Sequence, residues 1–146
     1  MPLQRQYTVF FTTTISITLL IVSCSDSKVN QCQKITNVTN KAASEAKAFA
    51  GGGKAKNPDA MLKAADTMDK AAEEMAAIKV SDSKLKEYQT GFIKMYRDTS
   101  KSTRGFVVAF KKKERPAVES TLKNLKQAIA PEPSLLNGLT TYCKSK

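Results

Sequence analysis

A row of basic side chains is the part of this sequence with the clearest capacity for binding chemistry. Lys94, Arg97, Lys101 and Arg104 follow one another at spacings of three and four residues, which places them on one face of a helix. The row runs on toward further cations at 111–113 and 115. Asp98 interrupts it, so an ordinary solvated helix face is the alternative interpretation. We take this face as the candidate surface for an anionic partner.

Residues suited to catalysis are scarce, and the chain contains no histidine. This absence removes the commonest acid–base group and a frequent metal ligand. Ser81 and Lys84 have the Ser-x-x-Lys spacing in which a lysine can activate a serine, but helix capping explains the same residues and the companion motifs are missing. Asp66 and Asp69 are expected on a solvated helix face. We therefore predict a protein that is not an enzyme and that uses no metal or cofactor.

The opening segment consists of three consecutive regions with different physical properties. Arg5 supplies a positive charge, residues 7–22 are largely apolar, and the segment closes with Ile21-Val22-Ser23-Cys24. These four residues resemble the lipobox of bacterial lipoproteins: an aliphatic residue, a tolerated residue and a small residue before a cysteine. The resemblance implies acylation of the Cys24 sulfur, by fatty acids such as palmitate. It also implies cleavage before Cys24, with 1–23 as signal peptide and 24–30 as tether.

The lipobox resemblance implies a location in the cell envelope, anchored by lipid to the extracytoplasmic side of a membrane. Two alternatives stay open from the residues alone. One is an ordinary cleaved signal peptide of a secreted protein, and the other is an uncleaved anchor. The apolar stretch is shorter than the roughly 20 residues that a spanning helix needs, which disfavours the uncleaved anchor.

Cysteine usage agrees with export. If Cys24 carries lipid, two cysteines remain, with Cys32 near the start of the following domain and Cys143 near its end. An even number of thiols in an oxidising compartment favours a disulfide. We predict a Cys32–Cys143 bond; two free thiols, or a bond to another molecule, are the alternatives.

Net charge narrows the class of partner. The chain has 24 Lys+Arg and 13 Asp+Glu, and removal of residues 1–23 takes away only Arg5, which leaves a net charge of 23 − 13 = +10. Such a charge suggests nucleic acid for a cytoplasmic protein, but export argues against a nucleic-acid partner. The expected partners are the anchoring membrane and an anionic cell-wall polymer, lipid headgroup or acidic protein. A lysine-rich surface that only maintains solubility is the alternative.

Helical periodicity predicts the fold. Apolar residues recur at spacings of three and four, with capping and breaking residues between the runs, over about 32–50, 58–78, 85–110, 116–129 and 134–143. The third run is expected to bury Phe110, and the fourth to bury Leu122 and Ile129. We predict an all-α domain over 31–146, an antiparallel helix bundle of about four helices plus a short C-terminal helix, closed by one disulfide.

Methionines in the second run raise an alternative function. Met61, Met68 and Met75 recur at a heptad spacing, which favours packing in the bundle core. Thioethers are also soft and adaptable, so that a bundle rich in methionine and aromatic residues can hold an apolar molecule. A carrier of a small apolar ligand is therefore the alternative to a protein that binds through its basic face.

A second set of residues, mostly polar and aromatic positions of the third run together with the two cysteines, resembles small helical envelope proteins of cyanobacteria and other bacteria. They are Leu85-Lys86-Glu87-Tyr88-Gln89, Phe92, Met95-Tyr96, Thr99-Ser100-Lys101, Cys32 and Tyr142-Cys143. This resemblance implies the helical fold and the envelope location, and it transfers no functional residue.

Overall fold

The computed structural model describes residues 27–50 and 57–145, and within these ranges it contains only helices and their connections. The prediction of an all-α fold is confirmed. The helices are α1 (Lys28–Ala50), α2 (Pro58–Ala77), α3 (Ser83–Lys111), α4 (Arg115–Ile129) and α5 (Glu132–Lys144).

Two of the predicted boundaries were wrong. α1 begins at Lys28, so residues 28–30 of the predicted tether are helical. α5 begins at Glu132, two residues before the predicted start at 134, because the ring of Pro133 is tolerated in the first turn of a helix.

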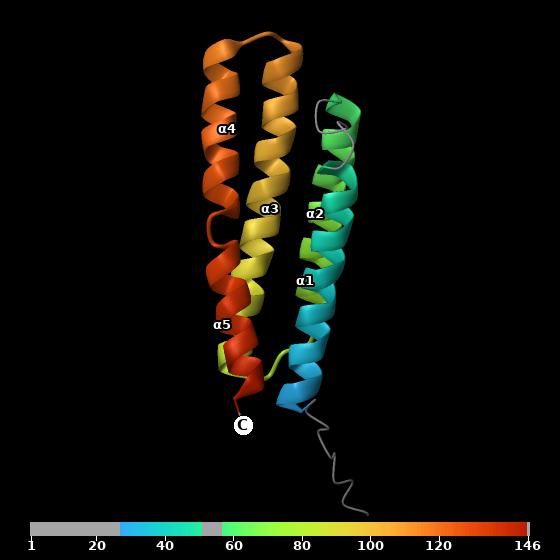
Figure 1. Cartoon of the computed structure of the whole chain (residues 1–146), viewed down its shortest axis with the longest axis vertical. Helices are drawn as coiled ribbons and strands as arrows, with labels where there is room; N and C mark the ends of the chain where they lie inside the picture. The colour runs from blue at the N-terminus through green and yellow to red at the C-terminus, as the bar shows by residue number, and fades with distance from the viewer. Residues whose placement is uncertain (1–26, 51–56, 146) are drawn as a thin grey trace, which may run out of the picture.

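The helices are arranged as two antiparallel hairpins that lie side by side. α1 pairs with α2, α3 pairs with α4, and the two hairpins meet chiefly where α2 packs along α3 (Figure 1). α5 continues in the direction of α4 after a short break and packs against the lower half of α3 and against α1. α4 and α5 together therefore take the place of the fourth helix of the bundle.

Local chemistry explains where α2 and α3 begin. The Asn57 side chain accepts a 2.9 Å hydrogen bond from the Asp59 backbone, and Pro58 occupies the first turn of α2. Asp82 caps α3 through a 2.9 Å bond from the Leu85 backbone N–H. The Gln89 amide donates to the carbonyl oxygens of Met75 and Ile78 at the end of α2, at 2.8 Å each. These bonds fix the turn between α2 and α3.

The core lies between α1, α2, α3 and α5. Its fully buried large side chains include Ile35, Met75, Leu85 and Phe92. Met75 lies in this core and Met68 packs against it, as the methionine spacing predicts, whereas Met61 is half-buried and lies outside it. Small residues permit close approach elsewhere: a Cβ on Gly91 would lie 2.6 Å from a methyl group of Leu135 in α5.

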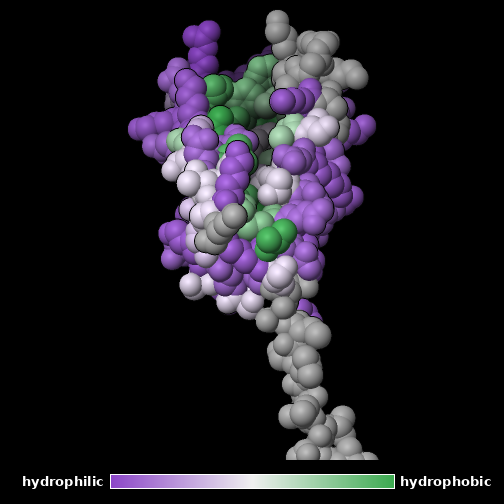
Figure 2. Space-filling model, turned by 60° about the horizontal axis from the view of Figure 1, so that its bottom comes forward, coloured by the Kyte–Doolittle hydropathy of each residue, from purple (hydrophilic) through white to green (hydrophobic). Residues whose placement is uncertain are grey.

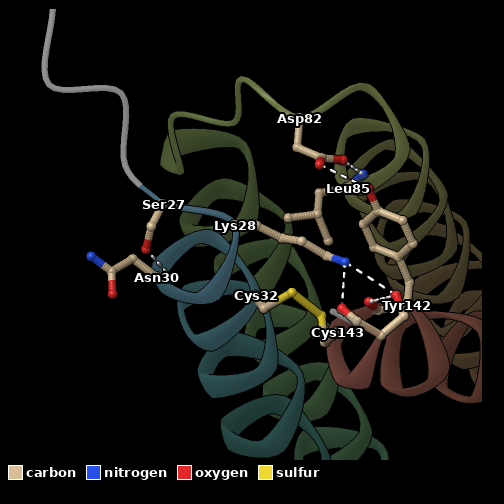
Figure 3. The surroundings of a disulfide bond; sticks show 9 residues. Ser27, Lys28, Asn30, Cys32, Asp82, Leu85, Tyr142 and Cys143 are labelled. Atoms are coloured by element: carbon tan, nitrogen blue, oxygen red, sulfur yellow. Dashed lines mark hydrogen bonds between the residues drawn. A yellow bond between two sulfur atoms is a disulfide. The ribbon is translucent and has the colours of Figure 1, made fainter.

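The predicted disulfide is present and joins the first helix to the last. Cys32 of α1 and Cys143 of α5 are bonded, with their Cα atoms 5.8 Å apart and a sequence separation of 111. Figure 3 shows the bond at the end of the bundle where α1 begins and α5 ends. The bundle is thus covalently closed at this end.

Parts of the α3–α4 hairpin are less buried than predicted. Phe110 is 53% exposed, and Leu122 and Ile129 of α4 are 37% and 44% exposed. One reason is length, since α3 has 29 residues against 23 in α1 and 20 in α2, and its upper end extends past theirs (Figure 1). The other is that α4 packs on α3, whereas α1 packs on α2, α5 and α3. The apolar face of α4 is therefore only partly covered.

Removal of the disulfide tests how far it stabilises the fold. We expect the Cys32→Ala/Cys143→Ala variant to lose about 4 to 5 kcal/mol of unfolding free energy, because the bond closes a loop of 111 residues in the unfolded chain. Urea titration followed by circular dichroism measures the loss. The parent protein under reducing conditions should match the variant, and equal stabilities of the oxidised parent and the variant would contradict the expectation.

Candidate functional site

The structure divides the predicted basic row between two environments. Arg104 turns toward α2 and donates to the carboxylates of Asp66 and Asp69 at 2.6 and 2.7 Å. The side chains of the two aspartates are 65% and 46% exposed, as a solvated face predicts, but their pairing with Arg104 was not predicted. Positions 66 and 69 lie 38 and 35 residues before Arg104, and the packing of α2 along α3 brings the three side chains together.

Charge pairing favours the ionised forms of Arg104 and Asp69. The hydrogen bonds that Arg104 donates to Asp69 and then to Asp66 raise the pKa of Arg104 above its usual value. Partial burial opposes ionisation of Asp69, but the bonds from Arg104 and Ser100 keep its pKa below the usual range. Arg104 therefore connects the two hairpins and is not free to hold an external anion.

The other three members of the row stay at the surface. Lys94 pairs with Asp98 one turn along α3, and its side chain is 77% exposed. Lys101 and Arg97 are exposed. Lys94 and Lys101 line one side of an open cleft of about 500 Å³ between α3 and α4, opposite Asn124 and Gln127. The candidate face thus comprises Lys94, Arg97 and Lys101, with Asp98 among them.

Charge is distributed very unevenly between the two hairpins. α1 and α2 together carry six Lys and six Asp or Glu, so their formal charges cancel. Residues 94–126, which contain most of the α3–α4 hairpin, carry ten Lys or Arg against three Asp or Glu. Exposed cations gather at the turn between α3 and α4, at Lys111, Lys112, Lys113 and Arg115. We call residues 108–115 the hairpin tip.

An apolar groove lies on the side of the bundle where α1 faces α4 and α5. Its volume is about 200 Å³, and its lining includes Phe92 and Met95 of α3, Ile129 of α4, Leu136 of α5 and Ala46 of α1. In Figure 2, hydrophobic surface is visible in a recess between hydrophilic flanks. Sequence periodicity predicts which faces are apolar, but the groove was missed because periodicity does not show which faces lack a partner.

Two polar residues give this groove a distinct chemical character. Tyr96 and Glu132 both line it, and burial, with a further contribution from Glu132, raises the pKa of Tyr96 well above its ordinary value. Tyr96 is therefore a neutral hydroxyl at physiological pH. Neither residue was predicted as a site residue from the sequence, because Tyr96 falls on the apolar stripe of the third run and Glu132 lies in the break between the last two runs.

The Ser-x-x-Lys residues have separate structural partners at the closed end of the bundle. The Ser81 hydroxyl accepts a 2.9 Å bond from the Gln31 amide, whereas Lys84 pairs with Glu87. Ser81 thus belongs to a contact between α1 and the α2–α3 connection, and Lys84 to the surface of α3. The capping role expected of this segment falls to Asp82.

Asp82 also receives a bond from the last helix. The Tyr142 hydroxyl donates to it at 2.8 Å, and the Lys28 ammonium lies 4.1 Å from the centre of the Tyr142 ring (Figure 3). The Leu85 backbone and the Tyr142 hydroxyl hold the pKa of Asp82 below its usual range, and the same bond raises the pKa of Tyr142. One carboxylate thus caps α3 and holds α5.

Among the described residues, no cluster of three or more Cys, Asp or Glu side chains is placed to hold a metal ion. None of the helices in that part of the chain is long and apolar enough to span a membrane. Cys24 and the predicted signal peptide lie outside the described residues, as do Gly51–Gly53. Comparisons with protein-family models, with curated proteins and with solved structures find no match to this chain.

Replacement of Asp82 by asparagine separates its charge from its capping role. Asparagine caps helices as well as aspartate, so Asp82→Asn should lower the melting temperature mainly by weakening the bond from Tyr142. A carboxylate whose pKa is lowered on folding stabilises the fold above its unfolded pKa, near 4, and loses this contribution as the pH falls through its folded pKa. The variant should therefore be less stable than the parent at pH 7 and approach it below about pH 3.

Tyr142→Phe is the matched variant for this experiment, because it removes the hydroxyl and leaves the carboxylate cap in place. Thermal melts of the three proteins between pH 7 and pH 2.5 measure the effect. A difference between Asp82→Asn and the parent that stayed constant over this range would contradict the role of the charge.

Proposed function

We propose that this protein is a lipid-anchored lipoprotein of the cell envelope, without catalytic activity, that binds an anionic partner through its α3–α4 hairpin. The observation that carries the proposal is the separation of charge between the hairpins, with ten cations and three anions in residues 94–126 and cancelling charges in α1 and α2. A surface of one sign attracts partners of the other and accelerates their encounter.

The proposed anchor rests on the lipobox-like Ile21-Val22-Ser23-Cys24 and fits the position of the first helix. Three residues separate Cys24 from the start of α1 at Lys28, which lies at the closed end of the bundle. The basic hairpin tip lies at the other end (Figure 1). A lipid on Cys24 would therefore leave the tip directed away from the anchoring membrane.

The arrangement of ion pairs supports the hairpin as the binding surface. Within the α1–α2 hairpin, Glu74 binds Lys41 at 2.7 Å and lies 4.0 Å from Lys70. On α3 and α4, carboxylates are few, and Arg104 is paired only by contributions from α2. The excess positive charge of the α3–α4 hairpin consequently faces solvent.

Charge reversal on the hairpin tests the proposal. We expect the Arg97→Glu/Lys101→Glu/Lys123→Glu variant to bind immobilised polyphosphate on the order of tenfold more weakly than the parent, because exposed ion pairs contribute up to about 1 kcal/mol each. Surface plasmon resonance at several salt concentrations measures the affinity. Binding by the parent should weaken as salt rises.

The control variant is Lys47→Glu/Lys63→Glu/Lys79→Glu, which changes the net charge equally on exposed positions outside the α3–α4 hairpin. It should keep most of the parent's affinity. Equal losses in the two variants would mean that net charge alone matters, and salt-insensitive binding would exclude an electrostatic partner surface.

The apolar groove favours a second candidate function, the binding of a small apolar molecule. A concave, mainly apolar lining with a few polar groups is typical of ligand sites. Ala46 of α1 lies at this groove, whereas Ala76 of α2 is exposed and is not among its lining residues. This pair offers a way to fill the groove without changing the rest of the molecule.

N-Phenyl-1-naphthylamine, a neutral dye that fluoresces in apolar surroundings, is a suitable probe. We expect its fluorescence to rise with the parent and with Ala76→Trp, and to fall toward the value in buffer with Ala46→Trp, because the indole occupies the groove. Retention of the full signal by a folded Ala46→Trp variant would place the dye elsewhere and remove this candidate.

A further inference from the structure

We propose that the hairpin tip docks on an anionic lipid bilayer, so that the protein joins two bilayer surfaces, one through lipid on Cys24 and one through the tip. The inference rests on the proposed function for the anchor and deepens it by naming the anionic partner. It draws on the chemistry of the tip and on the positions of the two ends of the bundle.

The tip presents cations in a fixed arrangement. Lys111, Lys112, Lys113 and Arg115 are all exposed and fall within five consecutive residues. Lys113 has φ of 58°, in the left-handed region, and the Glu114 backbone N–H bonds back to Ala109 at 3.1 Å. The chain is thus held in a tight, hydrogen-bonded turn that concentrates positive charge at one point of the molecule.

Large apolar side chains accompany these cations at the tip. Phe110 is 53% exposed and Val108 is 52% exposed, and the Phe110 ring stacks on Phe106 with centroids 6.0 Å apart. Exposed aromatic and aliphatic groups beside lysines are typical of surfaces that bind at the headgroup level of a membrane, where the ring enters the acyl boundary and the cations meet anionic headgroups. A soluble polyanion would use the cations but gain nothing from the apolar groups. This difference favours a bilayer over a polymer.

The geometry of the two ends places the tip on a different surface from the anchor. The 29 residues of α3 span about 43 Å at a helical rise of 1.5 Å per residue. The connection from Cys24 to Lys28 reaches at most about 14 Å in full extension. With the bundle standing on its anchor, the tip therefore projects beyond the reach of the anchoring bilayer, toward an opposing one (Figure 1).

Vesicle clustering tests the inference with the acylated full protein extracted from cell membranes. Flotation with neutral phosphatidylcholine vesicles first shows whether the protein is attached to a bilayer through its lipid anchor. These donor vesicles are then mixed with acceptor vesicles that contain phosphatidylglycerol, and clustering is followed by energy transfer between lipid dyes in the two populations. We expect clustering with anionic acceptors, none with neutral acceptors, and a decline as salt rises.

Two tip variants separate the contributions of charge and apolar surface. Lys111→Glu/Lys112→Glu/Lys113→Glu should lower the affinity for anionic acceptors by more than roughly 100-fold, since each lysine at such a surface contributes about fivefold. Phe110→Ser should weaken clustering on the order of tenfold while all cations remain. Lys47→Glu/Lys63→Glu/Lys79→Glu, with the same net charge as the first variant, should cluster like the parent. Circular dichroism confirms that each variant is folded.

The outcomes distinguish the failure of the inference from that of the proposed function. Binding of polyphosphate without clustering of anionic vesicles would overturn the inference that the partner is a bilayer, and would leave an anionic polymer or protein as the partner. Clustering unchanged by Phe110→Ser and by the tip charge reversal would also overturn it. Protein that does not float with neutral vesicles lacks the proposed anchor; in that case co-sedimentation of the same variants with anionic vesicles tests the tip by itself.

Discussion

The closed end of the bundle is the constraint on which the remaining structure depends. The Cys32–Cys143 bond joins α1 to α5, and the buried Gln31 side chain binds the α2–α3 connection through Ser81 and Asp82. The start of α1, the α2–α3 connection and the end of α5 are therefore fixed together within one small region (Figure 3). Because α1, α2, α3 and α5 each have one end in this region, the contacts there fix the positions of these helices relative to one another. Their opposite ends can then differ in length and separation without loss of the fold.

That freedom accounts for both surfaces with candidate functions. Where α5 reaches α1 the core is closed, but above the break at 130–131 the fourth position of the bundle is held by α4, which packs on α3. The apolar face of α3 lines the groove at this transition through Phe92 and Met95, beside Ile129. Beyond the ends of α1 and α2 the same face of α3 reaches the tip, where Phe110 is exposed. Exposed apolar area of this kind raises the free energy of the isolated molecule, so it indicates a partner more strongly than an equal area of lysines does.

Most of the fold could be predicted from the sequence, because the relevant signals are local. The helical periodicity and the capping residues locate α2 and α3. The number of cysteines, together with the expected oxidising compartment, predicts the disulfide. The failures concern pairing between distant segments. Helical spacing puts Arg104 on a basic row, but only the packing of α2 against α3 shows that Asp66 and Asp69 neutralise it. In the same way, an apolar stripe predicts burial for Ile129 or Phe110 without showing whether any helix covers it.

Repulsion among the cations of the α3–α4 hairpin costs free energy in the folded molecule, which solubility alone does not explain. Like charges on neighbouring turns repel, and a compact hairpin holds them closer together than the unfolded chain does. A bundle could relieve this repulsion with carboxylates from the other hairpin, yet α2 supplies them only to Arg104. The cations at 111–113 and 115 lie past the end of α2 (Figure 1), and among the described residues no carboxylate of α2 pairs with them. Their repulsion therefore falls when an external anionic surface approaches, and binding and folding of the tip become favourable for the same physical reason.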